Sequence, residues 1–296
     1  LGPVLLSIYI PTIVAFFVLA YAIMWMFRSF SLAWNLLKAY RNIHYASCVN
    51  WRKKMNLLEE NKKIWHAIVF VTYKEGWEVI EPSIRSYAES DFPQDRMIVV
   101  FAGEEADKQR ATEYYERIKK EFGHRFKDII FTIHPRGLPN EIPGKSANAT
   151  YGAKALQKYL DKHKIPYENV MVSNFDADTV AHPQYFAELT VKYCTTENPA
   201  LHTYQPIHLY HNNNWDVPLL IRLVALSCSF WRMAESMDKE RYKSFSSRSC
   251  SMKLLVDIDF WDPAVIPEDS RQYWTALFQT NGAHQLISIW TPLYLD

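Results

Sequence analysis

The segment "VMVSNFDADT", residues 170 to 179, joins an apolar run to two acidic residues. Its apolar first half predicts a buried strand, and Asp176 and Asp178 follow directly, two positions apart. Two carboxylates at this spacing repel each other, so we expect a positive partner or solvent between them. The candidates are a divalent metal, a nearby Lys or Arg, or water.

Strands and helices alternate on the N-terminal side of this segment. The composition and patterning predict strands over residues 64–73, 97–102, 128–134 and 169–175, and helices over residues 78–90, 106–122 and 146–162, the last with Ser146 as its cap. This alternation indicates an α/β layer structure with a largely parallel sheet. Ligands bind such sheets beyond the carboxyl ends of the strands. We therefore expect Asp176 and Asp178 at the mouth of a binding site.

Charge and cysteine content exclude several classes of protein. The 296 residues carry 33 basic and 32 acidic side chains, so no overall positive field favours nucleic acid as a partner. The four cysteines form no CxxC motif and no close pair, which argues against a disulfide framework or a zinc knuckle and fits a reducing compartment.

The N-terminal region differs from the rest in charge. Residues 1–27 contain no Asp, Glu, Lys or Arg, and residues 28–63 contain eight Lys or Arg but only two acids. The uncharged run is long enough for a transmembrane helix, which needs about 20 apolar residues, with Trp25 at the interface. A core helix and a signal peptide are the alternatives. The basic residues predict that the following domain is cytoplasmic, at the plasma membrane, by the positive-inside rule.

Two further helices bear on the membrane. Residues 29–60 predict a basic helix, which either lies on the anionic inner leaflet or packs on the domain as a linker. Residues 217–231 are apolar except for Arg222, and predict either a core helix or one that enters the membrane interface. Because the chain starts with Leu, we expect further residues upstream.

Four polar segments carry the candidate chemistry. "TYKEG" (72–76), "PGKSAN" (143–148) and "DAD" (176–178) follow predicted strands or precede a helix, and "PEDSRQYW" (267–274) comes later. The "GKS" is not a phosphate loop, because the required glycine five residues before Gly144 is Pro139. An Asp-x-Asp pair alone is weak evidence, since most such pairs are solvated or cap helices. The position of this Asp-x-Asp pair directly after a predicted buried strand makes a functional role more strongly indicated.

These segments, in this order, resemble the family 2 glycosyltransferases of the GT-A fold, from about residue 66 to the end. The family's Pro-x-Tyr-Asn-Glu, Gly-Lys-x-x-Ala-x-Asn, Asp-x-Asp and Glu-Asp motifs match, in turn, residues 71–75, 144–150, 176–178 and 268–269. At the end of the second strand, where the family often has an Asp that contacts the base, this chain has Phe101 and Ala102, and Glu104 or Glu105 is the substitute. The Gln-x-x-Arg-Trp motif of processive synthases does not occur in these residues.

The resemblance implies an inverting enzyme that moves a sugar from a nucleotide-diphosphate sugar to an acceptor hydroxyl, in glycan, polysaccharide or glycolipid synthesis. It implies a GT-A domain over residues 64–296 behind a transmembrane helix (1–27) and a basic juxtamembrane helix (28–63). The alternatives are a non-catalytic nucleotide-sugar-binding membrane scaffold and a metal-dependent nucleotide-sugar phosphohydrolase.

The resemblance also assigns roles to single residues. The nucleotide-sugar-binding residues are expected to be Thr72, Tyr73, Glu75, Lys145, Asp176 and Asp178. Asp178, with Asp176 nearby and facing the ribose, would hold Mg²⁺ or Mn²⁺, which suit carboxylate and phosphate oxygens. Lys145 is either a second positive contact to the diphosphate or a solvated loop lysine.

The Glu-Asp pair is expected to supply the catalytic base. Asp269 would remove the proton of the acceptor hydroxyl in a single displacement, and Glu268 would position it or bind the acceptor. The alternative is that Pro267, Glu268 and Asp269 only begin a helix, a common use of this residue combination.

Overall fold

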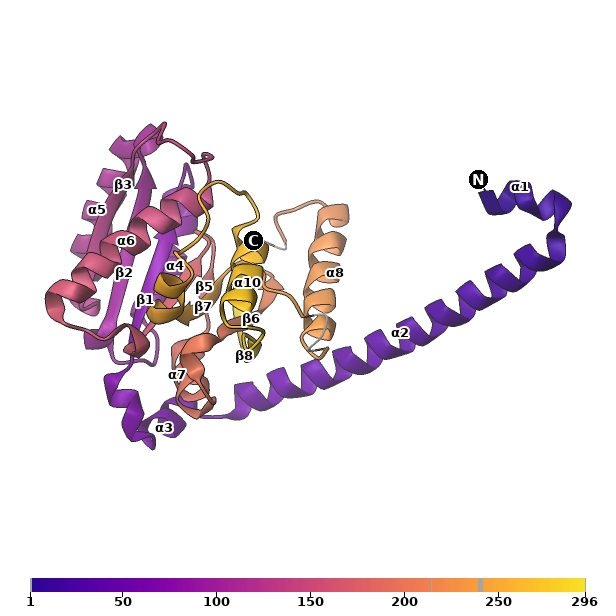
Figure 1. Cartoon of the computed structure of the whole chain (residues 1–296). Helices are drawn as coiled ribbons and strands as arrows, with labels where there is room; N and C mark the ends of the chain where they lie inside the picture. Colours follow the sequence, from indigo (N-terminus) through magenta and orange to yellow (C-terminus); the bar gives the residue numbers. More distant parts are fainter. Residues whose placement is uncertain (1, 214, 239–241, 296) are drawn as a thin grey trace.

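The structure is a computed structural model that describes residues 2–213, 215–238 and 242–295 (Figure 1). The strands are β1 (Trp65–Val71), β2 (Met97–Glu104), β3 (Asp128–His134), β4 (Val170–Phe175), β5 (Val180–Ala181), β6 (Thr203–Tyr210), β7 (Arg248–Ser251) and β8 (Leu286–Leu295). The helices are α1 (Gly2–Tyr9), α2 (Pro11–Cys48), α3 (Trp51–Asn56), α4 (Trp77–Ala88), α5 (Lys108–Phe122), α6 (Lys145–His163), α7 (Tyr185–Thr195), α8 (Leu219–Glu235), α9 (Met252–Asp257) and α10 (Glu268–Gln279).

One sheet of eight strands, in the order β3-β2-β1-β4-β7-β6-β8-β5, organises the domain. β3, β2, β1 and β4 are parallel neighbours, as the alternation of strands and helices predicts. Beyond β4 the sheet is mixed, because β7 is antiparallel to both β4 and β6, and β5 is antiparallel to β8. An antiparallel neighbour needs no helical crossover, so these strands leave no βαβ pattern in the sequence.

Helices cover both faces of the sheet, and the side chains of β1 show how. Ile68 and Phe70 point to the face that α4, α5 and α7 cover, and Ala67 and Val69 to the face that α6 and α9 cover. All four side chains are fully buried. Burying each large apolar side chain stabilises the fold by about 1.5–3 kcal/mol. The predicted α/β class, with helices on both faces behind a long apolar helix, is confirmed.

The start of α6 differs from the prediction. The helix begins at Lys145, and its N-cap position is Gly144, so Ser146 lies inside the first turn. The Ser146 hydroxyl instead donates a hydrogen bond of 2.6 Å to the carbonyl oxygen of Asp262. The serine therefore fixes α6 to the segment before α10 rather than capping its own helix.

The N-terminal region is an arm rather than part of the core (Figure 1). α2 runs without a break from the apolar run past Arg28, Lys38 and Arg41 to Cys48, so the helix predicted over residues 29–60 is the second half of α2 followed by α3. Asn50 then starts α3, because its side chain accepts a hydrogen bond from the Lys53 amide at 2.8 Å. In the described residues α2 is the one helix long and apolar enough to cross a membrane, and none of its most apolar 18-residue window is buried.

The domain end of α2 packs on the sheet domain. Leu36, Ala39 and Ile43 contact a small apolar cluster that includes Ile207 of β6 and Met233 of α8. The packed-linker alternative therefore describes this end of α2. The segment predicted as a core helix or an interfacial one forms α8, and the core alternative is wrong because most of its apolar side chains are exposed.

A close approach of α5 to β2 leads to a prediction about Gly103, the residue before Glu104. A Cβ at this position would lie 2.7 Å from the Cβ of Ala111 and 3.2 Å from Cδ1 of Ile133. Because both neighbours sit on packed elements, Gly103→Ala should lower the free energy of unfolding by about 1–3 kcal/mol, the usual effect of overpacking. Denaturant unfolding of the detergent-solubilised chain measures this change.

Gly123→Ala is the matched control. The nearest atom to its added Cβ is Cγ of Lys119 at 3.7 Å, an ordinary contact, and its φ of −56° suits any residue. This variant should be as stable as the wild type or slightly more stable. Equal destabilisation by both variants would contradict the proposed crowding at Gly103.

Candidate active site

A cavity of about 910 Å³ opens at the carboxyl ends of the parallel strands. The register brings these ends level, because Val71 of β1 pairs with Ala102 of β2, and Phe70 pairs with Phe175 of β4. Five of the predicted site residues line the cavity: Tyr73, Glu75, Lys145, Asp176 and Asp178. Thr72, Glu268 and Asp269 lie outside its lining.

The loop after β1 is held by its own acidic side chain. Glu75 Oε2 accepts hydrogen bonds from the Thr72 hydroxyl at 2.9 Å and from the Tyr73 amide at 2.5 Å. Lys74, between Tyr73 and Glu75, has a φ of 69°, in the left-handed region. Its amide donates a hydrogen bond of 3.2 Å to the Asp107 carboxylate. Thr72 is buried by this arrangement, whereas the Tyr73 ring is exposed toward the cavity. Thr72 thus positions the loop, and Tyr73 is the residue that a ligand can touch.

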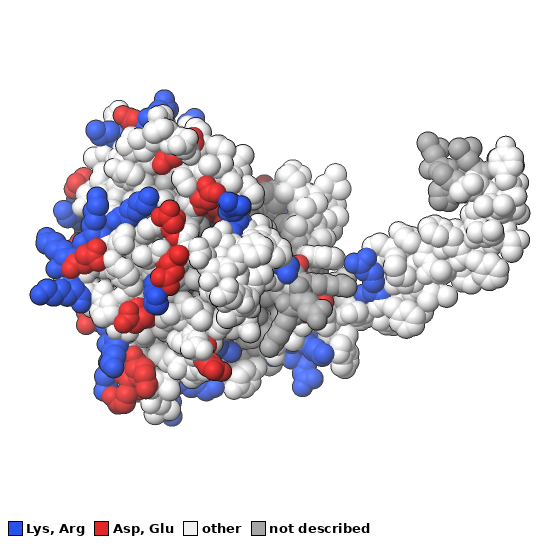
Figure 2. Space-filling view, in the orientation of Figure 1, with Lys and Arg blue, Asp and Glu red and all other residues white. Residues whose placement is uncertain are grey.

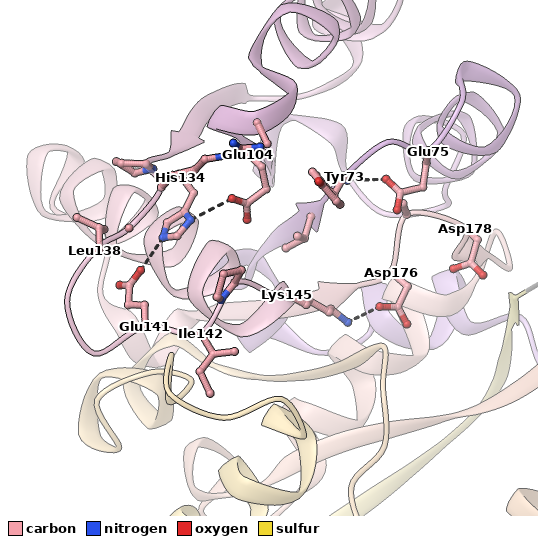
Figure 3. A pocket seen from close by; sticks show the side chains of 18 of the residues that line it. Tyr73, Glu75, Glu104, His134, Leu138, Glu141, Ile142, Lys145, Asp176 and Asp178 are labelled. Atoms are coloured by element: carbon pink, nitrogen blue, oxygen red, sulfur yellow. Dashed lines mark hydrogen bonds and ion pairs between the residues drawn. The ribbon is translucent and has the colours of Figure 1, made fainter.

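Lys145 is the positive partner of Asp176. Its ammonium group forms an ion pair with the Asp176 carboxylate across the cavity floor (Figure 3). The Ser246 hydroxyl donates to the other carboxylate oxygen, and the Asp176 amide donates to Ser247 at 3.2 Å. Burial acts to raise the pKa of Asp176, but the Lys145 charge and these hydrogen bonds outweigh it, so the pKa lies below its usual value. Asp176 is therefore a carboxylate at neutral pH.

Asp178 lies on the same side of the cavity as Asp176 and Glu75 (Figure 3). Its backbone oxygen accepts a hydrogen bond of 3.0 Å from the Asn212 side chain, which fixes the turn after β4. Among the described residues, no three His, Cys, Asp or Glu side chains are grouped closely enough to hold a metal ion by themselves. Mg²⁺ commonly binds through one or two carboxylates and completes its shell with substrate phosphates and water, and the two aspartates fit that donor set.

The Glu-Asp pair forms the first turn of α10, next to this floor. Glu268 is buried, and its Oε1 lies 3.7 Å from Nζ of Lys145, so Lys145 stands between Asp176 and Glu268. Neither acid caps the helix, because the N-cap position is Pro267 and no side chain caps it.

Asp269 instead has a buried basic partner that sequence reasoning missed. It forms an ion pair through Oδ1 with Arg248 of β7, a residue that is buried almost completely. Arg248 Nε also donates to Gln272 at 2.5 Å. Burial lowers the pKa of Arg248 to about 10, against the opposing effect of the Glu268 charge. The Glu268-Asp269 pair therefore does more than begin α10, because Asp269 also neutralises the buried guanidinium of Arg248.

A second group of side chains, also missed, lines the far side of the cavity. His134 ends β3 and lies between two carboxylates, with Nδ1 at 3.2 Å from Glu104 and Nε2 at 2.8 Å from Glu141 (Figure 3). Burial raises the pKa of Glu104, and the hydrogen bond from His134 opposes this rise. Of the two predicted substitutes at the end of β2, Glu104 lines the cavity, while Glu105 accepts a hydrogen bond from the Arg136 amide at 2.8 Å. The strand-end rule that selects Asp176 would also have selected His134.

No protein-family model matches the sequence, and no curated protein matches it. Solved structures with a similar fold include residues 1–349 of S. aureus TarS, at a TM-score of 0.49 and 12% identity, covering 79% of this chain and 60% of that one. The mannosyltransferase PcManGT from Pyrobaculum calidifontis, solved with GDP-Man and Mn²⁺, has a TM-score of 0.47 and 14% identity over 89% of this chain and 68% of that one.

A third similar structure is glucosyl-3-phosphoglycerate synthase from Mycobacterium tuberculosis, solved with Mn²⁺, UDP and phosphoglyceric acid. It has a TM-score of 0.47 and 14% identity over 82% of this chain and 73% of that one. This chain spans only 37% of the length of a longer TarS structure. At such identities and TM-scores the likeness concerns the path of the chain, and activity has to be inferred from the residues of this site.

Proposed function

We propose that the protein is a glycosyltransferase that moves a sugar from a nucleotide-diphosphate sugar to an acceptor hydroxyl. The observation that carries the proposal is the row Asp176, Lys145 and Glu268, which runs from the end of β4 to the first turn of α10, with Asp178 beside Asp176. It places the Lys145 cation and the carboxylates of Asp176 and Asp178 on one side of the cavity, with the Glu268-Asp269 pair next to them outside the lining. Such a row can bind a diphosphate and still keep a base close to the sugar.

Lys145 has the central role in donor binding. The negative charge of a diphosphate leaving group increases as the glycosidic bond breaks, and a fixed cation stabilises this change. The ion pair with Asp176 holds the Lys145 ammonium at the cavity floor, ready for the phosphate oxygens. Asp178, with Asp176, would hold a Mg²⁺ or Mn²⁺ ion that supplies further neutralisation of the diphosphate. Tyr73 and Glu75 are assigned to the nucleotide-sugar, with Thr72 fixing their loop.

Asp269 is proposed as the general base of a single displacement, which inverts the anomeric carbon. Arg248 holds its Oδ1 atom, so we assign the proton of the acceptor hydroxyl to Oδ2. Glu268 has the supporting role, because it lies beside Lys145 and contributes to the charge balance of the donor site. A positioned base typically accelerates such a reaction by about 10² to 10⁴-fold.

The membrane-anchoring part of the proposal rests on α2. We propose that residues 1–27 include the membrane span, that residues 28–63 form the basic juxtamembrane region, and that the domain from residue 64 onward lies on the cytoplasmic side of the plasma membrane. The apolar and exposed first half of α2 supports this arrangement, and so do the Lys and Arg residues that follow it.

Incubation with a panel of nucleotide sugars and a membrane extract, followed by mass spectrometry of the products, tests the proposal. Glycosylated acceptor is the expected product. Sugar phosphate and nucleoside monophosphate alone would favour the phosphohydrolase alternative, which needs an activated water and no acceptor. Nucleotide-sugar binding without any product would favour the scaffold alternative.

The first prediction here concerns the metal. Asp178→Asn removes a charged ligand from a loop at the cavity mouth, so it should abolish the metal-dependent part of nucleoside diphosphate binding and leave the fold intact. Calorimetry with a nucleoside diphosphate, with and without Mn²⁺, measures this. Asp257→Asn, which breaks only the exposed ion pair with Lys253 on α9, is the control and should bind normally. Undiminished Mn²⁺-dependent binding by Asp178→Asn would overturn the metal assignment.

The second prediction separates the catalytic role of Asp269 from its structural one. Asp269→Asn should lower the transfer rate by roughly 10² or more, because the amide cannot accept a proton at neutral pH. It should also cost about 2 kcal/mol of stability or more, because buried Arg248 loses its ion pair. Transfer assays stopped at fixed times measure the rate, and thermal melts measure the stability.

A double variant, Arg248→Met with Asp269→Asn, is the matched control, since it removes the buried charge that Asp269→Asn alone leaves without its ion pair. It should recover stability and remain inactive. Recovery of transfer along with stability would mean that Asp269 only neutralises Arg248. If Glu268→Gln lost transfer while Asp269→Asn kept the wild-type rate, Glu268 would be the base and Asp269 the supporting residue.

A further inference from the structure

α8 presents an apolar face to the surroundings. Leu220, Val224 and Trp231 are 76%, 63% and 56% exposed, and further large apolar side chains on the same helix are exposed with them. The opposite side of α8 is buried against the domain, where Ser229 and Met233 pack. An amphipathic helix whose apolar side faces outward marks an interaction surface, because contiguous exposed apolar patches are rare on soluble proteins.

The charges of α8 do not interrupt this face. Arg222 Nη2 donates to the carbonyl oxygen of Val217 at 3.2 Å, and its guanidinium lies 4.9 Å from the centre of the Trp215 ring. Arg232 forms an ion pair with Glu235. Figure 2 shows charged side chains scattered over the α/β domain, and few along the arm that α2 forms.

The position of α8 relative to α2 relates this face to a membrane. α8 packs on α2 near Ala39 through Met233, where α2 leaves the domain. It runs across the direction of α2 rather than alongside it (Figure 1). Residues 11–27 of α2, which carry no charge, rise about 26 Å, near the hydrocarbon thickness of a bilayer. If α2 crosses a membrane, α8 therefore lies along its surface.

The distribution of tryptophan identifies a bilayer as the partner. Five tryptophans are exposed among the described residues, and four of them lie on α2, on α8 or in the loop just before α8: Trp25, Trp34, Trp215 and Trp231. Tryptophan is enriched at the boundary between lipid and water, because its ring is apolar and its N–H is polar. Tryptophan is also common in protein interfaces, and the place of these four beside the proposed membrane span is what favours a bilayer.

The two helices also share a cavity of about 470 Å³. Apolar side chains line it from both helices, among them Trp25 and Leu32 of α2 and Trp231 of α8, and Arg28 and Glu235 lie among them. Apolar walls with a few charged groups fit the upper acyl chain and the headgroup region of one lipid molecule. The cavity thus extends the apolar surface from α2 to α8.

From these observations we infer that α8 docks on the lipid bilayer that α2 spans, as a second membrane contact with its apolar face in the interface. The inference rests on the membrane anchoring proposed for α2. It places the catalytic cavity close to the lipid surface, because Asn212, just before α8, holds the turn that carries Asp178. An acceptor at the membrane surface is the substrate class that this placement favours.

The exposed Cys228 on α8 allows a direct test in the full chain. In a Cys48→Ser, Cys194→Ser background, Cys228 is labelled with an environment-sensitive fluorophore, and the protein is reconstituted in vesicles of phosphatidylcholine and phosphatidylglycerol. Lipids that carry a quencher near the headgroup should remove most of the fluorescence, and iodide in the water should remove little. Leu220→Asp with Val224→Asp should reverse both results, whereas Leu220→Ala with Val224→Ala should change them less, because it adds no charge.

Two further labels separate the possible failures. A label at Ala20→Cys on α2 should be quenched by lipids with the quencher deep in the acyl chain, and one at Glu116→Cys on α5 should be quenched by iodide alone. A quenched Ala20 label with a water-exposed Cys228 label would overturn the docking of α8 and leave the anchoring intact. A water-exposed Ala20 label would overturn both. Protection of Cys228 that is lost when the protein is diluted among excess vesicles would show contact between copies instead. Each readout is independent of sugar transfer.

Discussion

The ion pair between Lys145 and Asp176 is the interaction on which the candidate site depends. It joins the first turn of α6 to the end of β4, two elements that meet only because the parallel strands end at the same level. Without the lysine, two carboxylates two residues apart would line the same cavity with less positive charge beside them. With it, Asp176 stays ionised, and the ammonium group is held at the cavity floor. The Nζ atom of the same lysine lies 3.7 Å from Oε1 of Glu268, so one cation connects two acidic positions.

The first half of the fold was predictable because its signals are local. β1 to β4 are apolar runs of six to eight residues, separated by helices with clear periodicity, and the bounds of β3 match the prediction residue for residue. The later strands were not predictable in this way. β5 has two residues and β7 has four, too short for a pattern, and β7 reads "RSCS" with a buried arginine in it. Their pairing is decided by long-range contacts.

The same distinction applies to the site. Tyr73, Glu75, Lys145, Asp176 and Asp178 were found because each follows a strand or starts a helix. Partners far away in the sequence were missed. Ser246 and Arg248 come from a segment with no motif, and each acquires its role from an acid that only the folded chain brings close. Arginine usually lies at the surface, so a buried arginine is not expected from the sequence. The Asp269 carboxylate neutralises the Arg248 guanidinium, which explains why the burial of Arg248 is tolerated.

α8 is inserted between β6 and β7, and residues of the segments that flank it contact the turn after β4. Asn212, before the helix, binds the backbone of Asp178, and Ser246, after it, binds the carboxylate of Asp176. A ligand of α8 that shifts these contacts changes the affinity of the turn for its own ligand, and the reverse effect must have the same size.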